Sequence, residues 1–386
     1  MPSVYLDHNA TTPVRPEVVE AMLPYLREHF GNPNSPYRIG QQARRAVEAA
    51  RGQVARLLNA QPAEVVFTSC GSESDVLAVC GAAQSAFERS RGARRHLVTS
   101  AVEHDAVREA CEGLKRRGFE VSVVGVDGQG RVDPDIVRRE IRPDTSLVSV
   151  MHSNNEVGTL QPVTEIAAAC REKGVLFHTD AVQTAGKLPL DVRSLGADLV
   201  ALSGHKLNAP KGVGALYVRQ GVRLAPVGTG HQERNRRGGT ENVASIVGFG
   251  LACELASAEL PRHAEEFLAL RKRLEDGCLR IPGSRVNGHP DERLPNTCHV
   301  SFDGLDAFQA VVALDLAGIC VSSGPACSTG AAEPSHVLEA MGIEPRWSLG
   351  SLRLSLGWGS TEADVDRLLE VLPGIVGKLR KVGSPI

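Results

Sequence analysis

The sequence lacks the short motifs that most often bind nucleotides and zinc. It contains no Gly-x-Gly-x-x-Gly segment and no Gly-x4-Gly-Lys-[Ser/Thr] segment, the phosphate-binding loops typical of dinucleotide and nucleoside triphosphate sites. It also has no His-x-x-x-His or paired-cysteine spacing of the kind that holds zinc. These absences disfavour a nucleotide cofactor and a metal site.

Signals for a leader segment, a membrane span or a basic surface are also missing. The first residues show no basic stretch followed by an apolar one, and no uninterrupted apolar run reaches about 18 residues. The formal net charge is −2, so direct nucleic-acid binding is not expected, although Arg234–Arg237 is either a local basic patch or a solvated loop. Nine cysteines without a Cys-x-x-Cys pair are typical of a reducing compartment. We therefore expect a cytoplasmic protein without membrane contact.

The 386 residues predict one large and one smaller domain. We predict a large domain over residues 14–255 and a small domain made of residues 1–13 and 256–386. In the first part, short β-branched runs alternate with amphipathic stretches, which predicts an α/β domain with a mostly parallel sheet, because parallel strands need helical crossovers. The later part mixes helices with isolated strands and predicts an α+β domain.

The short β-branched runs predict the strands, and the amphipathic stretches predict the helices. The predicted strands of the large domain are Val65–Thr68, His96–Ser100, Glu120–Val124, Ser146–His152, Val175–Asp180, Asp198–Ser203 and Gly214–Arg219. The predicted helices there are Pro16–Phe30, Gly40–Leu58, Glu73–Arg89, His104–Arg117, Pro162–Lys173 and Asn242–Leu260. In the small domain we predict helices at Arg262–Leu279, Ala307–Ala317 and Thr361–Lys381, and strands at Thr297–Phe302 and Leu352–Ser355.

One candidate anion site is the segment Thr68-Ser-Cys-Gly-Ser-Glu-Ser-Asp75, between a predicted strand and a predicted helix. Small residues there let backbone N–H groups face an anion, and the helix dipole favours phosphate. Ser72 can add a hydroxyl group. The same residues are also ordinary helix caps, so this segment alone leaves both interpretations open.

Two further polar residues end predicted strands. Asp180 stands where α/β sheets place their ligands, and a carboxylate there can keep a pyridinium nitrogen protonated. Lys206, in Ser203-Gly-His-Lys206, follows the next predicted strand and is suited to Schiff-base formation. The order and spacing of the two residues favour a pyridoxal phosphate (PLP) site.

The segment Ser203–Tyr217 resembles the lysine motif of cysteine desulfurases in the class V aminotransferase family. Nearly the whole chain follows this family, as shown by Tyr5–Pro13, Glu103-His104, Asn154–Gly158, Arg237–Asn242, Ser322–Gly330 and Arg353–Gly357. The resemblance implies PLP-dependent fold type I, with L-cysteine as substrate and L-alanine as product. The Cys327 segment resembles that of the nitrogen-fixation and iron–sulfur group.

The resemblance also implies roles for individual residues. Lys206 would carry the cofactor and move the substrate's α-proton, His104 would stack on the ring, and Asp180 would pair with the ring nitrogen. Gln183 and Asn155 would contact the phenolic oxygen, and Arg353 would bind the substrate carboxylate, with Asn155 also near the substrate. The implied phosphate ligands are Gly71, Ser72, Ser203, His205 and Thr240. In the family this threonine comes from a neighbouring subunit, which implies a homodimer.

Cys327 carries the step that defines the family. By resemblance, its thiolate takes the sulfur of L-cysteine as a persulfide and passes it to an acceptor protein. No resident metal is expected, with Cys327 a candidate ligand to a transient iron–sulfur cluster. The other eight cysteines are interpreted as buried small apolar residues.

Four positions depart from the usual motifs: Tyr37, Val76, Thr229 and Pro325. They indicate a dedicated branch, so the candidate acceptors are an iron–sulfur scaffold, a tRNA-thiolation enzyme or the machinery of DNA phosphorothioation. Alternatives within the fold are a selenocysteine lyase and an aminotransferase, and an alternative of another class is a non-catalytic scaffold. Cys327 and the joint presence of the site residues favour the desulfurase.

Overall fold

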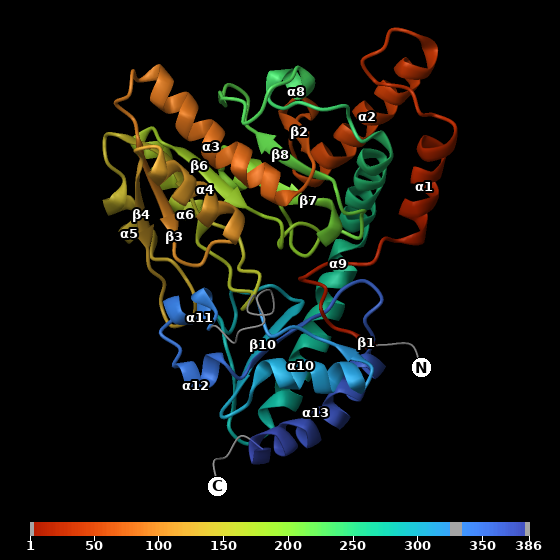
Figure 1. Ribbon diagram of the computed structural model, residues 1–386, viewed down its shortest axis with the longest axis vertical. Helices are drawn as coiled ribbons and strands as arrows, with labels where there is room; N and C mark the ends of the chain where they lie inside the picture. The colour runs from red at the N-terminus through yellow and green to blue at the C-terminus, as the bar shows by residue number, and fades with distance from the viewer. Residues whose placement is uncertain (1–3, 325–333, 383–386) are drawn as a thin grey trace.

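The computed structural model describes residues 4–324 and 334–382 (Figure 1). Its larger part is built on a seven-stranded sheet of order β2-β8-β7-β6-β5-β3-β4. The strands are β2 Val65–Thr68, β3 His96–Ser100, β4 Glu120–Val124, β5 Thr145–Ser149, β6 Leu176–Asp180, β7 Leu199–Ser203 and β8 Gly214–Val218. Strand β8 runs antiparallel to both of its neighbours, and all other pairs are parallel. The prediction of a mostly parallel α/β sheet is confirmed, with strand ends shifted by at most three residues.

Neighbouring apolar residues on these strands point to opposite faces of the sheet and pack into two separate cores. Val98, Val148 and Val200 face one core, which is completed by the first part of the chain and by α9. Leu97, Leu147 and Leu199, one position earlier, face the opposite core against α3 and α4. Because side chains alternate along a strand, a sheet covered on both faces reads as continuous apolar runs. This is why the sequence predicted the sheet so well.

Helices cover both faces of the sheet (Figure 1). In this part they are α1 Pro16–Arg27, α2 Arg38–Leu57, α3 Gly71–Arg89, α4 Asp105–Arg116, α5 Pro134–Glu140, α6 Val163–Lys173, α7 Val192–Leu195 and α8 Gln232–Asn235, with 3-10 turns at Pro62–Glu64 and Gly204–Lys206. The sequence did not predict α5, α7 or α8, because seven or fewer residues show too little periodicity.

A smaller core lies below the large sheet in Figure 1 and includes Leu6, near the start of the described residues, and Val376, in the last helix. Its antiparallel sheet has the order β12-β10-β9, and β1 pairs with β11 in a separate parallel ribbon. The elements are β1 Val4–Tyr5, β9 Ser284–Val286, β10 Thr297–Phe302, α10 Ala307–Leu316, β11 Ile319–Cys320, α11 His336–Ala340, α12 Pro345–Ser348, β12 Ser351–Ser355 and α13 Glu362–Val382. The N-terminal strand thus packs with the C-terminal third of the chain. The domain boundaries at residues 13/14 and 255/256 stay a prediction.

Helix α9 joins the two regions and differs from our expectation. We predicted two stretches separated at Pro261, but α9 is one helix, Val243–Leu279, with Pro261 inside. A proline within a helix costs about 3 kcal/mol, but packing before and after Pro261 offsets this cost. Phe249 lies in the core of the large sheet that also contains Val98, and Leu274 lies in the smaller core. By length and composition alone α9 could cross a membrane, but it packs against α1 and α2, as a core helix does.

The crossing of α9 over α2 depends on a glycine. A Cβ atom at Gly250 would lie 2.7 Å from the Cα atom of Ala50 and 2.4 Å from the side chain of Gln53. We expect Gly250→Ala to lower the free energy of unfolding by about 1–3 kcal/mol, as overpacking does. In contrast, Gly377→Ala in α13, where nothing lies within 4 Å, should be neutral or stabilising by about 1 kcal/mol. Urea unfolding measures both, and equal effects would contradict this account of the α2–α9 contact.

Candidate active site

A cavity of about 340 Å³ lies where β2, β5, β6 and β7 end. Such an edge is where α/β sheets bind ligands. Ten predicted site residues line it: Gly71, Ser72, His104, Asn155, Asp180, Gln183, Ser203, His205, Lys206 and Arg353. Thr240 is exposed and is not among the lining residues, and Cys327 lies outside the residues that the structure describes. The folded chain therefore brings together the residues predicted for cofactor and substrate, apart from these two.

One end of the cavity is suited to an anionic group. Helix α3 begins there at Gly71, so its first N–H groups and its dipole face the space. A Cβ atom at Gly71 would lie 2.9 Å from Val182 and 3.1 Å from Ser203, so the position has no room for a side chain. The buried hydroxyl of Ser203 has no hydrogen-bond partner among the residues that the structure describes. A hydroxyl without a partner beside a helix N-terminus fits the phosphate of PLP.

Asp180 and His104 fit the ring of the cofactor. The Oδ1 atom of Asp180 accepts a hydrogen bond of 2.8 Å from the backbone N–H of Val182. Burial raises the pKa of Asp180, while the nearby His104 and Lys206 act in the opposite direction. The Nδ1 atom of His104 accepts from the N–H of Ala106 at 3.1 Å, so the neutral ring carries its proton on Nε2. A buried carboxylate and an imidazole N–H are thus available in the cavity.

Lys206 is held by the backbone of the N-terminal segment. Its Nζ atom donates to the carbonyl oxygens of Asn9 and Ala10, at 2.5 and 2.7 Å. Burial, and to a smaller extent Arg353, lowers the pKa of Lys206 to about 8, although Asp7 and Asp180 act in the opposite direction. A large fraction of this amine is therefore neutral and nucleophilic near pH 8.

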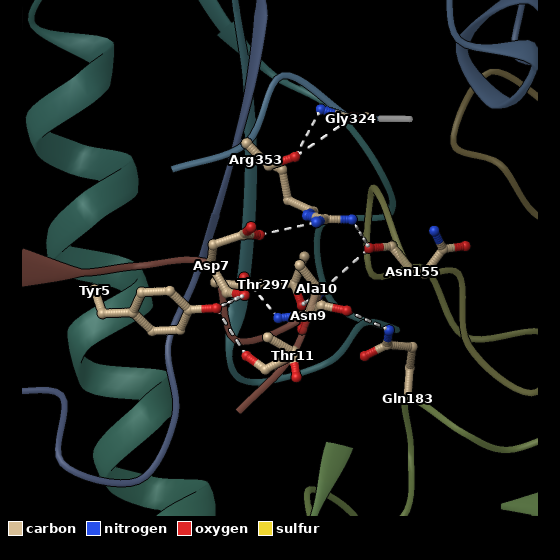
Figure 2. A network of polar contacts seen from close by, with 12 residues as sticks. Tyr5, Asp7, Asn9, Ala10, Thr11, Asn155, Gln183, Thr297, Gly324 and Arg353 are labelled. Atoms are coloured by element: carbon tan, nitrogen blue, oxygen red, sulfur yellow. Dashed lines mark hydrogen bonds and ion pairs between the residues drawn. The ribbon is translucent and has the colours of Figure 1, made fainter. Parts of the chain in front are cut away.

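The segment Asp7–Ala10 forms a hub of polar contacts (Figure 2). The carbonyl of Asn9 accepts from Gln183 Nε2 at 3.0 Å, and the Asn9 side chain donates to Thr297 Oγ1 and the Asn155 carbonyl. The segment thus contacts β10 of the small sheet as well as residues after β5 and β6 of the large one. Sequence analysis gave Asn9 and Ala10 no role, although the motif Tyr5–Pro13 contains them and could have indicated one.

Arg353 lies in β12 and is ready to bind an anion. Its Nη2 atom donates to Asp7 Oδ1 at 2.9 Å and its Nη1 atom to the carbonyl of Asn155 at 3.1 Å (Figure 2). Its Nε atom is buried and has no hydrogen-bond partner in the described parts of the chain, residues 4–324 and 334–382. A guanidinium held in place with a free N–H at a cavity wall suits a carboxylate.

The cavity also borders buried carboxyl groups that the sequence did not indicate as special. Asp75 lines it, and burial raises the pKa of Asp75 well above its usual value. Glu103 lies next to His104, accepts hydrogen bonds from Ser100 and the N–H of Met151, and has its pKa raised to about 8 by burial. No sequence signal distinguishes such residues from exposed acids, because only folding decides their burial.

The neutral fraction of Lys206 can be measured in the cofactor-free protein. We expect the rate of PLP capture to rise with pH through a midpoint near 8, because only the unprotonated amine attacks and the pKa of Lys206 is lowered to about 8. Stopped-flow absorbance measures this rate. Asp7→Asn should lower the midpoint, since Asp7 raises this pKa, whereas Asp315→Asn on the exposed surface of α10 should not. A midpoint near the ordinary lysine value, or an upward shift in Asp7→Asn, would be contrary to this account.

Three comparisons place the chain among known proteins. The family model "Aminotransferase class-V" matches residues 4–368. A protein of Methanosarcina thermophila named "Cysteine desulfurase IscS" is 49% identical over 385 residues, covering 100% of this chain and 94% of that protein. A "Cysteine desulfurase" of Gluconacetobacter diazotrophicus is 48% identical, with 99% and 95% covered.

Solved structures agree with the sequence matches. A "NIFS-LIKE PROTEIN" superposes with a TM-score of 0.91 at 38% identity, covering 98% of this chain and 100% of that one. A structure of DndA from Streptomyces lividans has a TM-score of 0.76 at 39% identity, with 90% and 97% covered. The predictions of fold type I and of a PLP-dependent enzyme are confirmed. The chain belongs to the aminotransferase class-V family.

Proposed function

We propose that this protein is a cysteine desulfurase that converts L-cysteine to L-alanine and places the sulfur on its own Cys327. The single observation that carries the proposal is the convergence of Lys206, Asp180 and Arg353 on one cavity, in a chain whose full-length relatives are named cysteine desulfurases. A non-catalytic scaffold has no need of this convergence. The names of the relatives favour the desulfurase over a selenocysteine lyase or an aminotransferase.

PLP bound in the cavity supplies an electron sink for negative charge at the substrate α-carbon. Asp180 would keep the ring nitrogen protonated, and the first turn of α3 would hold the phosphate. Arg353 binds the substrate carboxylate through its free N–H, which fixes the orientation of the α-carbon. The amine of Lys206 would take the proton from that carbon, and the lowered pKa of Lys206 leaves the amine free to accept it.

Sulfur transfer then needs a thiolate. We assign this role to Cys327: its sulfur attacks the substrate sulfur, a new S–S bond forms, and the C–S bond of the substrate breaks. The electron pair of that bond remains on the substrate carbon, which takes a proton and leaves as alanine. L-cysteine and one thiol therefore give L-alanine and one persulfide, without an external oxidant. His104, with its proton on Nε2, is placed to assist this proton transfer.

Described residues on both sides of Cys327 contact the site. Ser322 and Arg353 exchange backbone hydrogen bonds of 2.7 and 3.2 Å. Beyond the segment, Ser335 donates to Glu156 at 2.6 Å and His336 donates to the carbonyl of Glu103 at 3.1 Å. Glu156 immediately follows the cavity residue Asn155, and Glu103 immediately precedes the cavity residue His104. These contacts support Cys327 as the residue that meets the substrate.

The other cysteines are less suitable nucleophiles. Five of them are buried, namely Cys111, Cys170, Cys253, Cys278 and Cys298. Burial raises the pKa of the Cys111, Cys170 and Cys278 thiols to about 12, so hardly any thiolate is present at neutral pH. Cys70 lines the cavity, but its sulfur accepts a hydrogen bond from the N–H of Glu73 and caps α3. Cys80 and Cys320 are half-buried.

The proposal predicts a simple pattern of activity. The wild-type protein should be yellow and release alanine and, with a thiol reductant, sulfide from L-cysteine. Cys327→Ala should remain yellow and lose both products, and Lys206→Ala should lose the cofactor absorbance as well. Cys320→Ala on β11 is the matched control and should stay active. Full alanine release by Cys327→Ala would instead indicate elimination or transamination and overturn the proposal.

The position of Thr240 and an exposed apolar surface support the proposal of a homodimer. Thr240 is exposed in the single chain, and its neighbour Glu241 accepts a hydrogen bond of 3.4 Å from Asn34. Close to Asn34 in the sequence, Leu26, Phe30 and Tyr37 are 56 to 75% exposed. An apolar surface of this kind is typical of an interface. We infer that a second copy covers it and receives Thr240 as a phosphate ligand.

Mixed dimers test this arrangement. In a heterodimer of Lys206→Ala and Thr240→Ala chains, exchange of Thr240 between subunits leaves one complete site and one site with both defects. We therefore expect one molecule of PLP to bind per mixed dimer with wild-type affinity, while the Thr240→Ala homodimer binds about tenfold more weakly, the loss of about one hydrogen bond. If each chain uses its own Thr240, no site reaches wild-type affinity. Fluorescence titration of the purified species distinguishes the two.

The acceptor protein and the cellular location remain predictions from the sequence. We propose that the Cys327 persulfide passes to an acceptor protein in the cytoplasm, without direct nucleic-acid binding by this chain. The branch toward DNA phosphorothioation rests on Tyr37, Val76, Thr229 and Pro325, and Pro325 lies outside the described residues. A partner screen with the Cys327 persulfide that captured only iron–sulfur scaffold proteins would contradict that branch.

A further inference from the structure

A buried lysine next to the cavity has no role in the mechanism described above. Lys187 follows β6 by seven residues and is only 6% exposed. Its Nζ atom donates to the backbone carbonyl of Gln183 at 2.9 Å and to the Gln183 side-chain oxygen Oε1 at 3.0 Å. Among the residues that the structure describes, no carboxylate forms an ion pair with it. Burying an unpaired cation is unfavourable, so the position calls for an explanation.

The charges around Lys187 increase this cost. Burial, together with the positive charges of Lys206 and Arg353, lowers the pKa of Lys187 to about 7. On its other side, a small cavity is lined by His8, whose pKa is lowered to about 4, and by the Arg15–Glu259 pair. None of these groups provides a free negative charge for the amine. Within the described residues, the hydrogen bonds of the Lys187 amine therefore go to Gln183.

Those contacts fix which end of the Gln183 amide faces the site. A charged lysine amine only donates hydrogen bonds and the Asn9 carbonyl only accepts them, so both neighbours favour the amide oxygen facing Lys187. The amide nitrogen then faces the opposite way, where it donates to the Asn9 carbonyl at 3.0 Å beside the cavity (Figure 2). The reverse orientation would place the Gln183 amide oxygen against the Asn9 carbonyl oxygen and the Gln183 NH₂ group against the Lys187 amine. The chain thus enforces one orientation.

We propose that Lys187 is a positioning residue that holds the Gln183 amide with its NH₂ group toward the cavity, as the donor to the phenolic oxygen of PLP. The inference rests on the proposed function and deepens it, since Gln183 is one of the predicted contacts of that oxygen. A donor there stabilises the phenolate and weakens its hold on the neighbouring proton. Loss of a correctly oriented donor therefore raises the pH at which the visible absorption of the bound cofactor changes.

A double-mutant cycle on the holoenzyme tests the inference. The pH midpoint of the visible spectrum is measured for wild type, Lys187→Met, Gln183→Ala and the double variant. We expect an upward shift of about one pH unit in Lys187→Met, the size expected for one hydrogen bond to a charged group. We expect a similar or larger shift in Gln183→Ala, and no additional shift when Lys187→Met is combined with it. The exposed Lys211→Met provides the matched control and should titrate as wild type does.

The cycle separates positioning from a direct effect of charge. If Lys187 acted only through its positive charge, its shift would persist in the Gln183→Ala background and the two shifts would add; that result overturns the inference, as does an unshifted Lys187→Met. Lys187→Gln, which retains an N–H donor, should shift less than Lys187→Met and serves if the latter does not fold. Alanine production by wild type separately tests the proposed function, so the two can fail independently.

Discussion

The site depends on the polar contacts of a single segment, Asp7–Ala10. Its carbonyl groups hold the amine of Lys206 and the amide of Gln183, and its carboxylate holds Arg353. The same segment continues from β1, which pairs with β11. Since the catalytic amine and the carboxylate anchor come from different sheets, a common contact between them sets their relative placement. A displacement of this segment would move both, and substrate alignment is sensitive to such shifts.

The second constraint on the site is that several of its polar groups are buried without interactions that fully replace their contacts with water. The Ser203 hydroxyl and the Arg353 Nε atom are buried without hydrogen-bond partners among the described residues, and Lys187 and Glu103 have strongly shifted pKa values. Each of these features costs stability in the empty protein. Such features cluster where a bound group supplies the missing partners. The site is therefore built for its cofactor and substrate rather than for the stability of the isolated chain.

Much of this could be predicted from the sequence, for physical reasons. Strands buried on both faces give apolar runs, so the seven-stranded sheet was found, and residues at strand ends, such as Asp180 and Lys206, were expected to meet. Local patterns could not predict that Asn9 lies at the cavity, because its side chain is held there by hydrogen bonds to residues 146 and 288 positions farther along the chain. The continuous α9 was missed because proline is a strong local signal, whereas the packing that offsets it is tertiary. Lys187 carries no sequence signal for burial at all.

The central claim is that Cys327 receives sulfur in a reaction directed by this cavity. The most direct test is mass spectrometry of the holoenzyme after a single turnover with sulfur-labelled L-cysteine and no reductant. The account predicts one labelled sulfur atom per active site on the peptide that contains Cys327, together with one equivalent of alanine. Label on Cys70 or on another cysteine, or alanine formed without any protein-bound label, would contradict it.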